Sequence, residues 1–135
     1  MRLIYNFLIT LVQWMLPIST LFGSKMKAFV QGRKVVFTHL AENLDQQKAV
    51  IWFHAASLGE YEQGLPVIKA IHQLYPDHQM VLSFFSPSGY EHKKDTAFTS
   101  MPGLSKGVVC YLPLDTRVNA IKFLDVINLI LNIVK

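Results

Sequence analysis

The chain has 135 residues, of which 51% are hydrophobic and 16% are charged, and its formal net charge is +4. This length is enough for one domain with a hydrophobic core. The basic excess is small and scattered, so the sequence does not predict a nucleic-acid-binding protein. It does fit an anionic partner, such as a phospholipid head group or a phosphorylated ligand. The single cysteine, Cys110, cannot form an internal disulfide bond, and its apolar neighbours predict a buried thiol.

The first predicted element is an apolar helix near the amino terminus. Residues 3–22 contain no charged side chain, and a helix of that length would span about 30 Å, the thickness of a bilayer core. Lysine and arginine residues follow this segment, so the positive-inside rule places the downstream residues in the cytoplasm. We therefore predict a membrane-anchoring helix over residues 1–24.

Polar residues recur along this predicted helix at intervals of three and four, which places them on one stripe. They are Asn6, Thr10, Gln13, Pro17, Thr20 and Ser24. Such a stripe suits a helix that lies in the head-group plane, or a spanning helix whose stripe faces protein. A buried core helix of a soluble protein is the third interpretation. The pattern leaves all three open.

The rest of the chain divides into a basic linker over residues 25–48, with one short helix over 36–43, and an α/β domain over residues 49–135. In the second part, apolar runs alternate with segments of helical spacing, which is typical of βαβ units and a parallel sheet. The predicted strands are residues 49–54, 79–85 and 108–112, with 129–134 as a candidate fourth strand. The predicted helices are residues 60–75, 89–98 and 118–126. This pattern predicts a Rossmann-like parallel sheet covered by helices on both faces.

Ligands of such sheets bind at the carboxyl ends of the strands, so the loop after the first strand is a candidate site. Ser57 and Glu60 have the S-x-x-E spacing of a capping box, and the simplest interpretation of Glu60 is a helix cap. A carboxylate in this place also points toward the ligand crevice. There it could accept a proton from a hydroxyl group, as a general base does.

The loop after the second strand has the same spacing of serine and glutamate. Ser88 and Glu91 have capping-box spacing, and Gly89 lies between them. Backbone N–H groups at two neighbouring helix starts predict an anion site. Lys93 and Lys94 could add positive charge, although a solvated helix face is the simpler interpretation of both lysines.

Several other chemistries lack their sequence signals. The chain contains neither a G-x-G-x-x-G nor a G-x-x-x-x-G-K-[ST] motif. Its five histidines lie on different predicted elements without metal-ligand spacing, and His54 is expected to have a structural role. We therefore expect neither a cofactor nor a metal site.

Four segments resemble motifs of the 3-deoxy-D-manno-octulosonic acid (Kdo) transferases. Residues 54–60 match the H-x-x-S-x-G-E motif of that family, and residues 86–91 match its T-P-T-G-x-E loop with serine for both threonines. Residues 111–115 resemble its Y-L-P-Y-D segment, and residues 120–125 resemble the helix that follows. The order and spacing of these motifs make the resemblance specific. An amino-terminal apolar anchor with a basic flank also belongs to the family.

The resemblance implies the amino-terminal, acceptor-binding domain of a GT-B glycosyltransferase. The family transfers Kdo from CMP-Kdo to the lipid A precursor (lipid IVA) with inversion at the anomeric carbon, during lipopolysaccharide biosynthesis at the cytoplasmic face of the inner membrane. Glu60 matches the general base of the family. The acceptor-binding residues implied by the two loops are Ser57, Gly59, Ser86, Ser88 and Gly89.

The end of the chain departs from the family pattern. After Asn128 the family continues with a proline, an apolar strand and an E-L-W-P-like motif, whereas this chain ends at Lys135. We therefore expect that the donor-binding domain is absent, through truncation or a frameshift, and that the chain alone is inactive. A non-catalytic membrane-surface domain that binds phosphorylated lipid and a remnant without function remain as alternatives.

Overall fold

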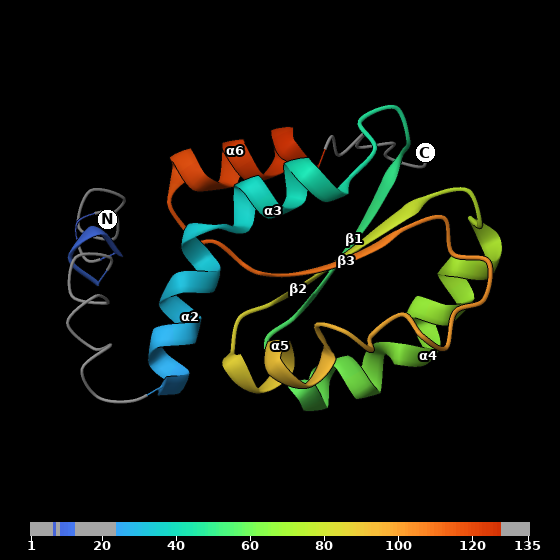
Figure 1. Cartoon of the computed structure of the whole chain (residues 1–135), viewed down its shortest axis with the longest axis horizontal. Helices are drawn as coiled ribbons and strands as arrows, with labels where there is room; N and C mark the ends of the chain where they lie inside the picture. Colours follow the sequence, from blue (N-terminus) through green and yellow to red (C-terminus); the bar gives the residue numbers. More distant parts are fainter. Residues whose placement is uncertain (1–6, 8, 13–23, 128–135) are drawn as a thin grey trace.

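The computed structural model describes residues 7, 9–12 and 24–127, which form a parallel three-stranded sheet with helices packed on both faces. The strands are β1 (Val50–Ala55), β2 (Gln79–Phe84) and β3 (Gly107–Tyr111). The helices are α2 (Ser24–Lys34), α3 (Val36–Asn43), α4 (Leu58–Leu74), α5 (Pro87–Lys93) and α6 (Arg117–Val126). Helices α3 and α6 cover one face of the sheet, and α4 and α5 cover the other (Figure 1). The predicted Rossmann-like α/β sheet is confirmed.

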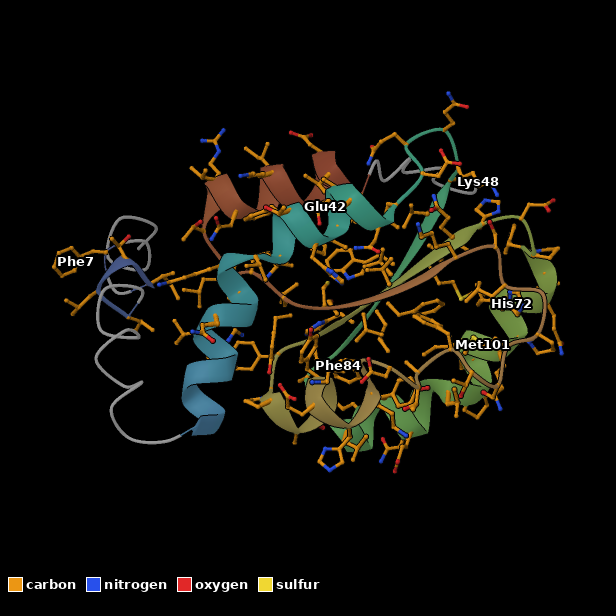
Figure 2. All side chains as sticks on the ribbon, viewed as in Figure 1. Phe7, Glu42, Lys48, His72, Phe84 and Met101 are labelled. Carbon is orange, nitrogen blue, oxygen red and sulfur yellow. The ribbon has the colours of Figure 1, made fainter. Side chains whose placement is uncertain are left out.

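Strand β2 is the centre of the sheet, since it pairs in parallel with both β1 and β3. All six of its side chains are buried. Val81 faces the core under α3 and α6, whereas Met80, Leu82 and Phe84 face the core over α4. Phe84 lies in the layer between the sheet and the helices in Figure 2. A strand that is buried on both faces appears in the sequence as an unbroken apolar run. For this reason the strand predicted at 79–85 agrees closely with β2.

Residues 25–48 are not a linker, which corrects the predicted organisation. Helix α2 packs against β3 and α5, and α3 packs against β3 and α6. The predicted helix at 36–43 is confirmed, but α2 was missed. Its contact with the sheet depends on Gly32, because a Cβ atom at this position would overlap the ring of Tyr111. A helix that packs through a glycine and a few neighbours shows no apolar stripe in the sequence.

The helix expected over residues 89–98 begins earlier and is shorter. Helix α5 starts at Pro87, a residue favoured at the first helical position, and ends at Lys93. Turns follow it, and within them Ala97 is buried against α4, where its carbonyl accepts a hydrogen bond from Tyr61 Oη at 2.7 Å. The residues after α5 therefore contribute to the core beside α4 although they are not helical.

Most of the predicted anchor and the candidate fourth strand at 129–134 lie outside the described residues. Among residues 7, 9–12 and 24–127, no helix has both the length and the apolar character needed to cross a bilayer. The membrane anchor over residues 1–24 stays a prediction.

Candidate functional site

The three strands end at one edge of the sheet, and this edge brings the two predicted loops together. Ala55 is the register partner of Phe84, which in turn is the partner of Tyr111. Beyond the strands, Ser86 N donates to Ala56 O at 3.0 Å. The loop after β1 and the loop after β2 therefore run side by side, as the sequence predicted.

Glu60 lies in the first turn of α4 and closes a cap around its start. Ser57 is the N-cap residue, and its Oγ accepts a long hydrogen bond from Glu60 N at 3.4 Å. In return, Glu60 Oε2 accepts a hydrogen bond from Ala56 N at 2.6 Å. The predicted cap at Ser57 is confirmed, with the reciprocal bond made to the residue before the N-cap.

This cap leaves part of the Glu60 carboxylate free for chemistry. The side chain is exposed at the carboxyl end of β1, and within the described part of the chain its Oε1 has no hydrogen-bond partner. The bond from Ala56 N fixes the direction of the carboxylate. A cap and a proton acceptor are therefore compatible roles for the same side chain.

The two glycines of the predicted site differ in their surroundings. Gly59 is exposed, and a Cβ atom there would meet only Ser57 Oγ, at 4.0 Å. Gly89 is buried, and a Cβ atom there would overlap the ring of Phe84. Packing explains the glycine at position 89, whereas nothing in the packing requires one at position 59. A side chain at position 59 would therefore make no clash with the described residues.

The capping box expected at Ser88 and Glu91 is wrong. Because α5 starts at Pro87, the N-cap residue is Ser86, and it makes no side-chain cap bond. Ser86 Oγ and Ser88 Oγ instead share a hydrogen bond of 2.8 Å. Glu91 forms an ion pair with Lys94 at 3.0 Å and accepts a long hydrogen bond from Tyr111 Oη at 3.5 Å.

The two lysines after this loop have acidic neighbours. Lys94 pairs with Glu91, and Lys93 Nζ lies 3.8 Å from Glu62 Oε1 and over the ring of Tyr61. These contacts favour the interpretation of both lysines as helix-surface residues.

The sequence did not single out Arg33, which the structure places at the same edge. Its side chain reaches from α2 to the ends of two strands, where Nε donates to Leu112 O at 2.9 Å and Nη2 donates to Phe85 O at 3.0 Å. The residue is 9% exposed, and burial lowers the pKa of its guanidinium to about 10. No periodicity marks it, because its role depends on contacts far away in the sequence.

The remaining polar residues near the edge have structural partners. His54 Nδ1 lies 3.0 Å from Ser83 Oγ, which also accepts a hydrogen bond from Trp52 Nε1 at 2.8 Å. Cys110 is buried as expected, and burial raises the pKa of its thiol to about 12. In the described ranges, no three His, Cys, Asp or Glu residues gather where they could hold a metal ion.

Comparisons with known proteins agree with this fold and these motifs. Residues 31–134 match the family described as 3-Deoxy-D-manno-octulosonic-acid transferase (kdotransferase). The chain is also 38% identical over 53 residues to the 3-deoxy-D-manno-octulosonic acid transferase of Aquifex aeolicus (strain VF5). That match spans 39% of this chain and 14% of the relative. No solved structure shows a significant match. Since the family match covers most of the chain, the chain belongs to the Kdo transferase family.

Proposed function

We propose that this chain forms the acceptor side of a Kdo transferase of the GT-B type. The intact enzyme would move Kdo from CMP-Kdo to a hydroxyl group of the lipid A precursor lipid IVA, at the cytoplasmic face of the inner membrane. Family membership supports the choice of sugar. The observation that carries the proposal is the Glu60 carboxylate, which is exposed at the carboxyl end of β1 with Oε1 unoccupied by any described residue. Turnover would need a donor-binding domain as well.

Glu60 would act as the general base. Its Oε1 takes the proton of the acceptor hydroxyl while that oxygen forms a bond to the anomeric carbon of Kdo. The bond from that carbon to the phosphate of CMP breaks at the same time, CMP departs with the electron pair, and the configuration inverts. Such a base contributes about 10²- to 10⁴-fold to a rate. The hydrogen bond from Ala56 N holds the carboxylate in position throughout.

The two loops would receive the acceptor. The Ser86 and Ser88 hydroxyl groups lie at the same edge as Ser57 and can exchange hydrogen bonds with a sugar. The missing side chain at Gly59 gives the acceptor room to approach the backbone close to Glu60. Gly89 would contribute indirectly, because it sets the position of α5 against Phe84.

The test is Glu60→Gln in a transferase that carries this domain together with a donor-binding domain. We expect kcat to fall at least about 100-fold, because an amide cannot take the proton. The matched control is Glu62→Gln, which removes an exposed carboxylate from the same helix on the side of Lys93. It should keep near-normal turnover. If both variants unfold at the wild-type temperature and Glu60→Gln still turns over normally, the assignment of the base is wrong.

The alternative function is a non-catalytic domain that binds phosphorylated lipid at a membrane surface. It would need no catalytic base, and the contacts of Glu60 are those of a helix cap, which by themselves require no catalysis. The chain would then bind vesicles that contain the lipid A precursor more tightly than plain anionic vesicles of equal charge. In a transferase that also carries a donor-binding domain, Glu60→Gln would not change turnover. Equal binding to both kinds of vesicle would exclude this alternative.

A further inference from the structure

Arg33 is a buried cation at the edge of the sheet where the acceptor is proposed to bind. Its guanidinium joins the ends of β2 and β3 through the carbonyl groups of Phe85 and Leu112. Three aromatic rings surround it, with centroids 3.6 Å (Phe29), 5.0 Å (Phe85) and 5.6 Å (Tyr111) from its central carbon. Ring faces attract a cation but carry no net charge, so they compensate its burial only in part.

No anion of the described chain neutralises this charge. The ion pairs among the described residues involve lysines, and none includes Arg33. Glu91 approaches the region through Tyr111 Oη, but it is already paired with Lys94. The lowered pKa of Arg33 has burial as its main cause, and it is still high enough to keep the group charged at neutral pH. A buried charge without a counter-charge is costly, and an anion that reached it would be bound strongly.

One nitrogen of the guanidinium is also without a partner. Nε and Nη2 each donate to a carbonyl oxygen, whereas Nη1 is buried and makes no hydrogen bond. Arginine presents its donors in a planar fork that matches the oxygens of phosphate and carboxylate groups. The unused N–H donor and the unpaired positive charge therefore both favour an anionic ligand with oxygen acceptors.

We propose that Arg33 binds a phosphate monoester group of the acceptor through Nη1. This inference rests on the proposed acceptor role of the domain and names the chemical group that the edge of the sheet recognises. Adjacent strands lie about 4.8 Å apart, so the ends of β1 and β3 are about 10 Å apart. An acceptor that lies across the strand ends, with its hydroxyl near Glu60, would reach Arg33 if its phosphate lay near the ends of β2 and β3.

The phosphate would reach Nη1 by displacing an aromatic ring. Phe85 follows β2 directly, and its side chain is 52% exposed, whereas Tyr111 is 1% exposed. Of these two rings, that of Phe85 is thus the one that can turn into solvent. Phe85→Ala keeps the charge of Arg33, so it should preserve or increase phosphate binding.

The first experiment uses the unsubstituted full chain in detergent micelles, labelled with ¹⁵N in its arginines. The chain has three arginines (Arg2, Arg33 and Arg117), so their side-chain NMR signals can be assigned with single Arg→Lys variants. Inorganic phosphate is titrated at constant ionic strength. We expect the Arg33 signals to shift saturably while those of the exposed Arg117 stay in place. Shifts at Arg33 no larger than those at Arg117 would show that Arg33 is only a structural clamp.

The second experiment separates a lipid phosphate from free phosphate. Binding of the phosphorylated lipid A precursor is compared with binding of the same lipid after removal of its phosphates. The wild type should prefer the phosphorylated lipid by about tenfold or more, as a hydrogen bond between charged groups allows. Arg33→Met should lose this preference, and Arg117→Met should keep it.

Each outcome of these measurements is informative. If Arg33→Met does not fold, as circular dichroism would reveal, the NMR titration of the unsubstituted chain decides whether the anion site exists, and Phe85→Ala tests it a second time. Saturable shifts with free phosphate but no preference for the phosphorylated lipid would overturn the assignment to the acceptor. Neither measurement involves turnover, so their failure is distinct from a failure of the Glu60 proposal.

Discussion

Gly89 lies directly against the ring of Phe84, so closely that a Cβ atom at position 89 would overlap the ring. Phe84 is fully buried at the end of β2, so its ring has little freedom to move aside. At Gly59, in the first turn of α4, a Cβ atom would meet only Ser57 Oγ, at 4.0 Å. The two glycines, each in the first turn of a helix, therefore differ in their surroundings: packing requires a glycine at position 89 but not at position 59.

We expect Gly89→Ala to lower the free energy of unfolding by about 1–3 kcal/mol, because the added methyl group overpacks the contact with Phe84. Gly59→Ala is the matched control. It should leave stability unchanged or raise it by up to about 1 kcal/mol, since alanine favours the helix. Urea denaturation measures both. Equal destabilisation by the two substitutions would contradict this account of the glycines.

Gln79 is fully buried at the start of β2 and holds the loop that follows α3. Its Oε1 accepts a hydrogen bond from Asp45 N at 2.8 Å, and its Nε2 donates to Asp45 O at 2.7 Å. Gln79→Met should lower the free energy of unfolding by about 1–3 kcal/mol, because it leaves these backbone groups unpaired. Gln73→Met, at an exposed position, should change it by less than about 0.5 kcal/mol. A similar urea midpoint for both variants would refute the role of Gln79.

Cys110 should make stability depend on alkaline pH. Burial raises the pKa of its thiol from 9.0 to about 12 in the folded protein. Well below pH 9 the thiol is protonated in both states, so its contribution is constant. Between pH 9 and 12 the unfolded chain loses the proton and the folded chain keeps it, so the free energy of unfolding falls as pH rises. The slope approaches about 1.4 kcal/mol per pH unit at most.

The variant Cys110→Ala isolates this effect, because the other titrating groups remain. The stability difference between the wild type and Cys110→Ala is expected to be constant at about pH 7 and to shrink or reverse as the pH rises through 9 and above. Urea titrations at pH 7, 9, 10 and 11 provide the comparison. A difference that does not change with pH would mean that the thiol is not protected from ionisation.

Ser83 links two side chains of β1 to the centre of the sheet. It is buried, and its Oγ accepts a hydrogen bond from Trp52 Nε1 at 2.8 Å and lies 3.0 Å from His54 Nδ1. Ser83→Ala should therefore lower the free energy of unfolding by about 1–3 kcal/mol. Ser105→Ala, at an exposed position that accepts a bond from Lys48 Nζ, should have little effect. Thermal unfolding monitored by circular dichroism distinguishes the two outcomes.

The sheet could be predicted from the sequence because its strands are continuous apolar runs. The strand predicted at 49–54 is Val50–Ala55, and the one predicted at 79–85 is Gln79–Phe84. Helix α2 could not be predicted in this way. It reaches the sheet through Gly32 and the long side chain of Arg33, so the usual apolar periodicity is missing.

The candidate site was predictable where its geometry is local. The cap between Ser57 and Glu60 depends on residues three positions apart, and it forms as expected. The second cap failed because Pro87 sets the start of α5 and moves Ser88 out of the N-cap position. Arg33 depends on the carbonyl group of Leu112, 79 positions away, and no local pattern encodes such a contact.

Helix α2 follows directly after the apolar amino-terminal segment, and it carries Phe29 and Arg33 to the ends of β2 and β3. A shortened protein that begins at residue 35, where α2 has ended, could be made to improve solubility. Such a shortened protein would keep all three strands but would lose the contacts that Phe29 and Arg33 make at the strand ends, and the ring of Tyr111 would be uncovered. Trimming for biochemical work should therefore stop before Ser24.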